Sequence, residues 1–133
     1  MKQFIVSFEI STTKYSLCEL SSKIGLQYGS GSYDKGKKRY GRTAEQTVWK
    51  LFSRLHESAS LEEHCQDIFK LLSNIDMSKL QELQEDCGLY LNIGVLYDSN
   101  TCSVCIANNY IELVNSYGLN IDISCYPTNF EEG

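Results

Sequence analysis

The last third of the chain, residues 89–126, constrains the fold most, because its apolar residues change periodicity twice. Apolar residues alternate over 89–97 and again over 102–106, which is the period of a strand with one buried face. The polar residues 98–101 predict a tight turn between these strands. A helix is expected from Asn109 to Gly118, and alternation then resumes until Pro127. The segment predicts strand, turn, strand, helix and strand, and it contains no recognisable active-site motif.

The first third predicts a strand, a helix and a long loop. Residues 3–10 alternate as in a strand with one buried face. Ser16 and Glu19 have the spacing of a capping box, and Gly25 provides the left-handed residue that ends many helices. Several glycines follow within residues 27–42, which predicts an irregular loop.

The segment 43–55 fits two structures. Thr43 and Gln46 could cap a helix, and some of the apolar residues that follow have helical spacing. Trp49 and the β-branched pair Thr47–Val48 are more typical of a strand. We therefore expect a strand here, with a helix as the alternative.

Two helices are expected in the middle of the chain. Ser60 and Glu63 form a second capping box before the amphipathic segment 61–72, and a shorter helix is expected to end at Gly88. The predicted element order is β-α-β-α-α-β-β-α-β. The simplest arrangement is a single α+β domain over 1–133, with a five-stranded, mostly antiparallel sheet and helices packed on one face.

The composition is typical of a soluble protein of one domain. The chain has 133 residues, of which 42% are hydrophobic and 22% charged. No apolar run approaches the roughly 20 residues that span a bilayer. The N-terminal apolar stretch is broken by Glu9 and lacks a cleavage site, so it resembles a strand more than a signal peptide. We expect a cytoplasmic protein without membrane association.

The chain has six cysteines, but their positions favour free thiols in the core. A reducing compartment keeps such thiols unpaired, and unpaired cysteine is commonly buried. Those expected on apolar faces of helices are Cys18, Cys65 and Cys87, and those expected on apolar faces of strands are Cys102 and Cys125.

The stretches that match a known family are Glu19–Leu26, Asp34–Gly36, Thr47–Ser53 and Tyr117–Tyr126. They contain an Ile-Gly that ends a helix, a Lys-Gly loop, a tryptophan strand and a closing strand that ends in tyrosine. In these stretches the chain resembles an uncharacterised bacterial family, domain of unknown function 4279. The resemblance covers nearly the whole chain and favours the strand at Trp49. It implies no catalytic residues, and the genomic setting of relatives implies an immunity or defence role by association alone.

No cluster of reactive side chains specifies catalysis. Cys102 and Cys105 have metal-ligand spacing, but in an extended strand they point to opposite faces, and no second pair completes a zinc site. His64 diverges around its helix from the adjacent Cys65, which disfavours a local Cys–His pair. Gly29-Ser30-Gly31 lacks the strand before it and the helix after it that a phosphate-binding loop requires. We expect no enzyme, no metal and no cofactor.

The strongest candidate for binding is a basic loop that interleaves cations with tyrosines. Such a loop could contact phosphates and stack on bases, as in a small RNA- or nucleotide-binding module. The plainer alternative is a solvated loop whose charges balance the acidic helices. The residues concerned are Tyr33, Lys35, Lys37, Lys38, Arg39, Tyr40 and Arg42.

The middle of the chain is acidic, and the net charge of −5 disfavours general nucleic-acid binding. An acidic helical face could steer the chain to a basic partner. Our first hypothesis is therefore a non-enzymatic immunity-type protein that neutralises a basic toxin, and the plainer alternative is an ordinary solvent-facing helix surface. The acids concerned are Glu62, Glu63, Asp67, Glu82, Glu85 and Asp86. The sequence does not specify an oligomeric state.

Overall fold

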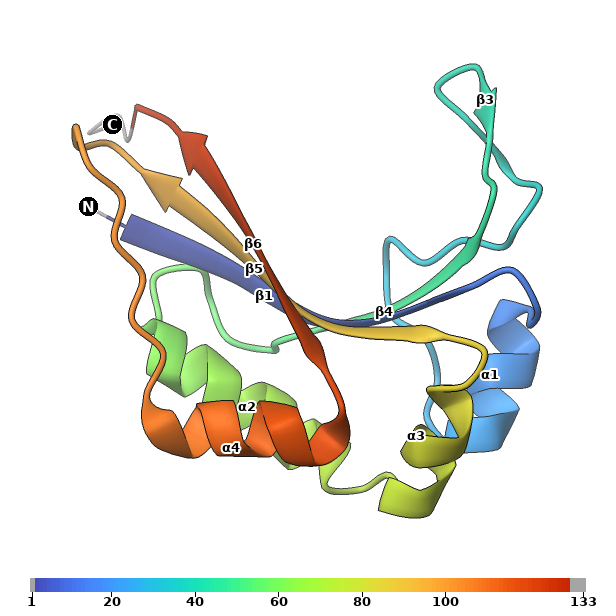
Figure 1. The fold of residues 1–133 in the computed structure, drawn as a ribbon. Coiled ribbons are helices and arrows are strands. Elements are labelled where there is room, and N and C mark those ends of the chain that lie inside the picture. Colours follow the sequence, from blue (N-terminus) through green and yellow to red (C-terminus); the bar gives the residue numbers. More distant parts are fainter. Residues whose placement is uncertain (1, 130–133) are drawn as a thin grey trace.

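The computed structural model describes residues 2–129, which form one central sheet with helices on one face (Figure 1). The sheet has the strand order β4-β1-β5-β6. Strand β1 (Lys2–Thr12) pairs antiparallel with β4 (Thr47–Phe52) and with β5 (Gly88–Tyr97). Strand β6 (Asn120–Pro127) pairs parallel with β5. The α+β class is confirmed, and the sheet is mixed.

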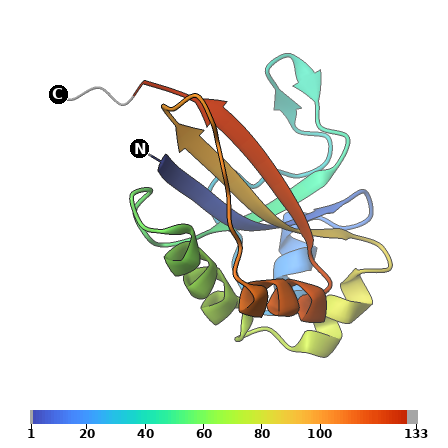
Figure 2. The same ribbon diagram turned by 60° about the vertical axis from the view of Figure 1, so that its left-hand side comes forward.

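Four helices cover one face of this sheet (Figures 1 and 2). Their bounds are Leu17–Ile24 for α1, Leu61–Leu72 for α2, Met77–Leu83 for α3 and Asn108–Tyr117 for α4. Both predicted capping boxes are present: Ser16 accepts from the Glu19 N–H and Ser60 accepts from the Glu63 N–H, each at 3.1 Å. Helices α1 and α4 end at glycines in the left-handed conformation, as their sequences predict.

The core lies between the sheet and the helices. Alternate residues of β1, namely Val6, Phe8 and Ile10, point into it and are almost fully buried. Trp49 of β4 is also fully buried and packs edge-to-face against Phe8, with ring centroids 5.8 Å apart. The strand prediction for segment 43–55 is therefore confirmed over Thr47–Phe52.

The predicted strand over residues 102–106 is wrong. The chain bends at Ser99 and Asn100 after β5, as predicted, but it then runs without strand pairing to α4. Cys102, Val104 and Ile106 are half-buried against the core, while the residues between them are exposed. One-sided packing therefore produces the alternation that resembles a strand. Because the chain returns through α4, β6 runs parallel to β5, and the main sheet has four strands rather than five mostly antiparallel ones.

Two further expectations are corrected. Helix α3 ends at Leu83 with Gln84 as its C-cap, and Gly88 is the first residue of β5 rather than a helix stop. The glycine-rich loop contains a small hairpin of β2 (Lys38–Arg39) and β3 (Arg42–Thr43), which loop chemistry alone did not predict.

The cysteine prediction is wrong for several residues. Cys65 is buried, but Cys18 and Cys125 are exposed. Cys18 follows the buried Leu17 by one residue, which rotates it about 100° away from the apolar side of α1. Cys125 lies on a strand at the edge of the sheet, where most residues are exposed.

The face of the sheet opposite the helices is uncovered (Figure 2). The segment 29–33 covers the outer edge of β4: the Gly29 N–H donates to the Lys50 carbonyl at 2.7 Å, and the Tyr33 N–H donates to the Val48 carbonyl at 2.9 Å. Within residues 2–129, the outer edge of β6 has no strand partner.

Candidate functional site

The basic loop folds into a hairpin that projects away from the helical layer (Figure 1); we call residues 33–44 the basic hairpin. Tyr40 and Gly41 form the turn between β2 and β3, with φ values of 50° and 77°. Two-residue hairpin turns favour such positive φ values, which glycine adopts freely and a tyrosine rarely does. The Tyr40 side chain is 95% exposed. A large aromatic residue therefore occupies an unfavourable backbone conformation at the most projecting point, a combination typical of functional sites.

Arg39 lies close to two tyrosine rings. Its guanidinium carbon lies 4.0 Å from the centroid of the Tyr33 ring and 5.8 Å from that of Tyr40, within cation–π range. Tyr33 is attached to the body by two backbone hydrogen bonds with Val48 of β4. The cluster of three side chains therefore has a fixed base and an exposed tip. A hollow of about 490 Å³ is lined by Tyr33, Arg39, Tyr40, Arg42, Thr43 and Ala44.

The positive charge of the basic hairpin is not neutralised by acids of the described chain. None of its five cations forms an ion pair with an acid of residues 2–129. The Lys35 ammonium donates to the Thr13 carbonyl, at 3.5 Å. Asp34 at the base of the hairpin accepts from the Leu17 N–H at 2.8 Å, which ties the loop to the start of α1. No acid of the described chain therefore competes with an anionic ligand for these cations.

The six predicted acids do not form one free acidic face. Glu63 caps α2, Asp67 binds Arg54 at 2.6 Å, and Asp86 binds Lys14 at 3.0 Å. Hydrogen bonding from Arg54 holds the pKa of Asp67 below its ordinary value. Of the six, Glu62, Glu82 and Glu85 are exposed and have no partner in residues 2–129.

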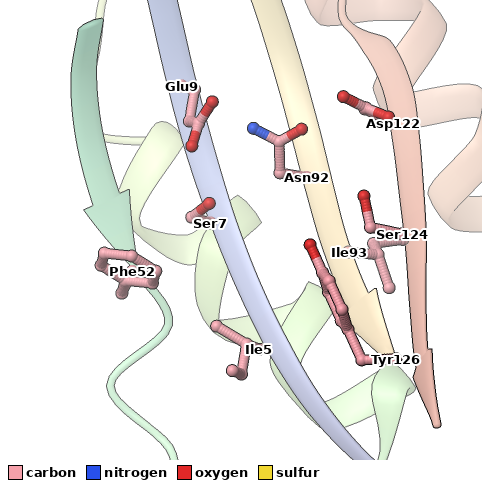
Figure 3. A pocket seen from close by; sticks show the side chains of 10 residues that line it. Ile5, Ser7, Glu9, Phe52, Asn92, Ile93, Asp122, Ser124 and Tyr126 are labelled. Carbon is pink, nitrogen blue, oxygen red and sulfur yellow. The ribbon is translucent and has the colours of Figure 1, made fainter. Parts of the chain in front are cut away.

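A groove of about 440 Å³ crosses the uncovered face of the sheet (Figure 3). Glu9, Asn92 and Asp122 lie at one end, and aromatic and aliphatic side chains lie at the other (Figure 3). The Tyr126 ring lies over Gly94, where a Cβ atom would come 3.7 Å from the ring.

The electrostatics of this groove disfavour a polyanion. Lys50 neutralises Glu9 at 3.2 Å, but Asp122 is exposed and has no ion-pair partner in the described chain. The groove therefore suits hydroxyl or amine donors, and nucleic acid suits the basic hairpin better.

Comparison with known families finds a match over nearly the whole chain. A family model described as a domain of unknown function (DUF4279) matches residues 2–128. The chain belongs to this family. The match confirms the resemblance carried by the helix-ending Ile-Gly, the tryptophan strand and the closing strand. No curated protein and no solved structure matches the chain. Because the DUF4279 description names no activity, the function has to be argued from geometry.

The cysteines and histidines of this DUF4279 domain do not form a recognisable catalytic site. His64 is 1% exposed, and its Nδ1 atom lies 2.7 Å from the Ser53 hydroxyl. Ser53 also accepts from the Leu55 N–H, so the pair fastens the end of β4 to α2. Burial raises the pKa of the Cys65 thiol to about 11, which keeps it protonated and poorly nucleophilic.

Metal binding has no supporting cluster in the part of the chain that the structure describes, since no three His, Cys, Asp or Glu residues gather there. Cys102 and Cys105 lie on opposite sides of their extended segment, one half-buried and one exposed. The thiol nearest to Cys102 is that of Cys125, with the two Sγ atoms 3.5 Å apart. Sequence reasoning missed this pair, because no local spacing relates the two residues.

None of the helices in residues 2–129 of this DUF4279 domain is long and apolar enough to cross a membrane.

Proposed function

We propose that this DUF4279 chain is a non-enzymatic binding protein that binds single-stranded RNA through the basic hairpin. The observation that carries the proposal is that Arg39 lies within cation–π range of both Tyr33 and the exposed Tyr40. Single-stranded nucleic acid is bound by aromatic rings on which bases stack and by cations that follow the phosphates. The hairpin supplies both kinds of group within one short segment.

The two tyrosines are expected to have different roles in binding, because their rings differ in exposure. One face of the Tyr33 ring is occupied by Arg39, whereas Tyr40 is 95% exposed and has open ring surface for a base. Stacking of a base on an aromatic side chain contributes about 1–3 kcal/mol. The lysines on either side of the cluster have no acidic partner in the described chain, so they are available to phosphates.

The net charge of −5 repels a polyanion, but the repulsion comes mostly from acids that lie outside the basic hairpin. At physiological salt, exposed charges separated by more than about 8 Å are largely screened from one another. The hairpin projects on the side of the sheet away from the helices (Figure 2). The local excess of cations therefore determines the attraction at the hairpin tip.

Fluorescence anisotropy with a labelled oligouridylate tests the proposal. We expect binding to wild-type protein that is lost in the double variant Lys37→Ala and Arg39→Ala. Lys70→Ala is the matched control, because Lys70 is an exposed cation on α2, outside the hairpin. No binding at about 50 μM protein, within the usual range of non-specific association, would overturn the proposal. Equal loss in the control would also overturn it.

A second candidate is the immunity-type protein that covers a basic toxin. It is supported by the exposed, unpaired carboxylates Glu62, Glu82 and Glu85, which can steer a basic protein toward the α2–α3 side. Its support is weaker because the other three acids already have partners inside the chain.

Affinity capture from native lysate at low salt distinguishes this candidate. The bait is wild-type protein, and the control bait carries Glu62→Gln, Glu82→Gln and Glu85→Gln. A basic protein that is retained by the wild type and lost with the triple variant supports the candidate. Equal retention by both baits, or retention of no protein, counts against it.

A further inference from the structure

Two thiols from distant parts of the sequence meet at the edge of the sheet. Cys102 lies on the extended segment 98–107, and Cys125 lies on β6. Their Sγ atoms are 3.5 Å apart, which is close contact for two sulfur atoms. Neither the basic hairpin nor the groove uses this pair.

The packing of the extended segment brings the two thiols together. Cys102 alternates with exposed neighbours and packs against the core with Val104 and Ile106. The Lys2 side chain donates to the carbonyl and hydroxyl of Ser103, which holds the segment beside the start of β1. The contact is therefore supported by interactions on the residues that flank Cys102.

On β6, the position of Cys125 follows from the two-residue period of a strand. Ser124 and Tyr126 line the groove on the uncovered face, so Cys125 points to the opposite face. It is exposed, whereas Cys102 is half-buried. The Cys125 sulfur is therefore open to a reagent in solution, and the less exposed Cys102 sulfur is in contact with it.

We propose that Cys102 and Cys125 form an intramolecular disulfide, with a low-molecular-weight disulfide as the oxidant. The Cys125 thiolate attacks one sulfur of the reagent, which breaks the reagent's S–S bond and releases one thiol. The Cys102 thiolate then attacks the Cys125 sulfur of this mixed disulfide and releases the second thiol. The protein loses two protons and two electrons, which reduce the reagent to two thiols.

The order of attack follows from the surroundings of the two sulfurs. Burial, followed by the hydrogen bond to Cys125, raises the pKa of the Cys102 thiol. Cys102 is thus protonated and shielded at first, and exposed Cys125 is the sulfur that the reagent reaches. Cys102 acts as the resolving thiol once the mixed disulfide has formed.

The bond would close the loop 102–125, which contains α4. A closed loop has fewer conformations in the unfolded chain, so the oxidised protein is expected to melt at a higher temperature. The bond would also fasten β6, whose outer edge has no strand partner in residues 2–129, to the extended segment. Oxidation would therefore stabilise the side of the molecule that lies farthest from β4 in the sheet.

To test the proposal, the reduced protein is incubated with oxidised glutathione. The remaining free thiols are then counted, and cross-linked peptides are identified by mass spectrometry. We expect two of the six thiols to be lost, a cross-linked peptide pair containing Cys102 and Cys125, and a higher melting temperature. Dithiothreitol should reverse all three changes. Accumulation of mixed disulfides alone, or a cross-link that joins other cysteines, would overturn the proposal.

Three variants sharpen the test. Cys102→Ser should stop at a stable glutathione adduct on Cys125, because the resolving thiol is missing. Cys125→Ser, at an exposed position, should form no cross-link and show no oxidative rise in melting temperature. The matched control is Cys18→Ser, at an exposed position on α1, which should form the cross-link as the wild type does. A cross-link pattern unchanged in Cys125→Ser would overturn the assignment.

Discussion

The imidazole of His64 lies in the core, and the surroundings of its two nitrogens differ. Nδ1 contacts the Ser53 hydroxyl, whereas Nε2 is buried without a hydrogen bond of good geometry in the described chain. Burial lowers the pKa of His64, and this effect outweighs the nearby backbone carbonyl of His56 and the carboxylate of Glu63, which raise it. The folded state therefore favours the neutral ring.

A pH dependence of stability follows from this residue. Because the folded-state pKa is below the unfolded value of about 6.5, the unfolded chain binds the proton first as the pH falls. The contribution of His64 is complete above about pH 6.5 and is lost progressively below it. We expect the urea midpoint of the wild type to fall between about pH 7 and about pH 5.

His64→Gln is the matched variant, since glutamine does not titrate. Its urea midpoint should be lower at neutral pH but should vary less over the same range. The pKa values of Glu63 and Asp67 are also lowered, by hydrogen bonds from Ser60 and Arg54, so both acids stay ionised in this window. An equally steep pH dependence in His64→Gln would show that another group is responsible.

At the scale of the elements, the two glycines that end α1 and α4 provide a matched pair. Gly25 and Gly118 have φ values of 76° and 69°, in the left-handed region. A Cβ atom on Gly25 would meet nothing within 4 Å, whereas one on Gly118 would overlap the amide of Gln84. That amide donates to the Tyr117 carbonyl at the end of α4, at 3.1 Å.

Alanine at the two positions should therefore have unequal effects. We expect Gly25→Ala to cost about 1–2 kcal/mol, the strain of a left-handed alanine. Gly118→Ala should cost more, because it also displaces the Gln84 side chain and removes its hydrogen bond. Urea denaturation measures both. In a Gln84→Ala background the excess at Gly118 should disappear, and an excess that persists would contradict the steric explanation.

The hairpin turn is expected to show opposite effects on stability and on binding. Tyr40 has a φ of 50° and is 95% exposed, so its side chain contributes little to the fold while its backbone is strained. We expect Tyr40→Gly to leave the melting temperature unchanged or slightly higher. The same variant should weaken oligouridylate binding roughly 5- to 150-fold, because one stacking surface of about 1–3 kcal/mol is lost.

Thermal melting and anisotropy on the same samples check this prediction. Tyr97→Phe is a conservative aromatic control at the end of β5, away from the hairpin, and should change neither quantity much. A Tyr40→Gly protein that binds as tightly as the wild type would remove the aromatic residue from the proposed interface.

At the scale of the whole molecule, salt dependence reports how many cations meet the ligand. For single strands the slope of log affinity against log salt is about −0.7 for each phosphate neutralised. The basic hairpin carries five cations, so the slope should not be steeper than about −3.5. Titrations from about 50 mM to about 200 mM salt measure it. A steeper slope would place cations outside the hairpin in the interface, and a flat one would exclude phosphate contacts.

Local signals predicted much of the fold correctly. The capping boxes at Ser16 and Ser60 and the glycines at 25 and 118 mark helix ends that the structure confirms. These signals are reliable because the groups that satisfy a helix end lie within a few residues of it. The strand at Trp49 was also predicted from local signals. Its residue types pack well on a half-buried pleated surface.

The same reasoning was wrong at residues 102–106, because alternation records which side chains are buried and not which backbone groups are paired. Strand pairing depends on where the chain goes next, and here it goes to α4. The candidate site, too, was predicted only in part from the sequence. The residues of the basic loop were identified from composition, but their assembly around Arg39 depends on the hairpin turn and on the pairing of Tyr33 with Val48.

The sequence by itself determined the capped starts of α1 and α2 and the glycine ends of α1 and α4, because each depends on residues close together along the chain. It also determined the family, through short motifs spread over residues 2–128. Only the tertiary structure decided the parallel β5–β6 pair, the pairing of Asp67 with Arg54 and of Asp86 with Lys14, and the meeting of Cys102 with Cys125. These features join residues far apart in sequence. Their geometry is set by how the core packs, and packing is a property of all the elements together.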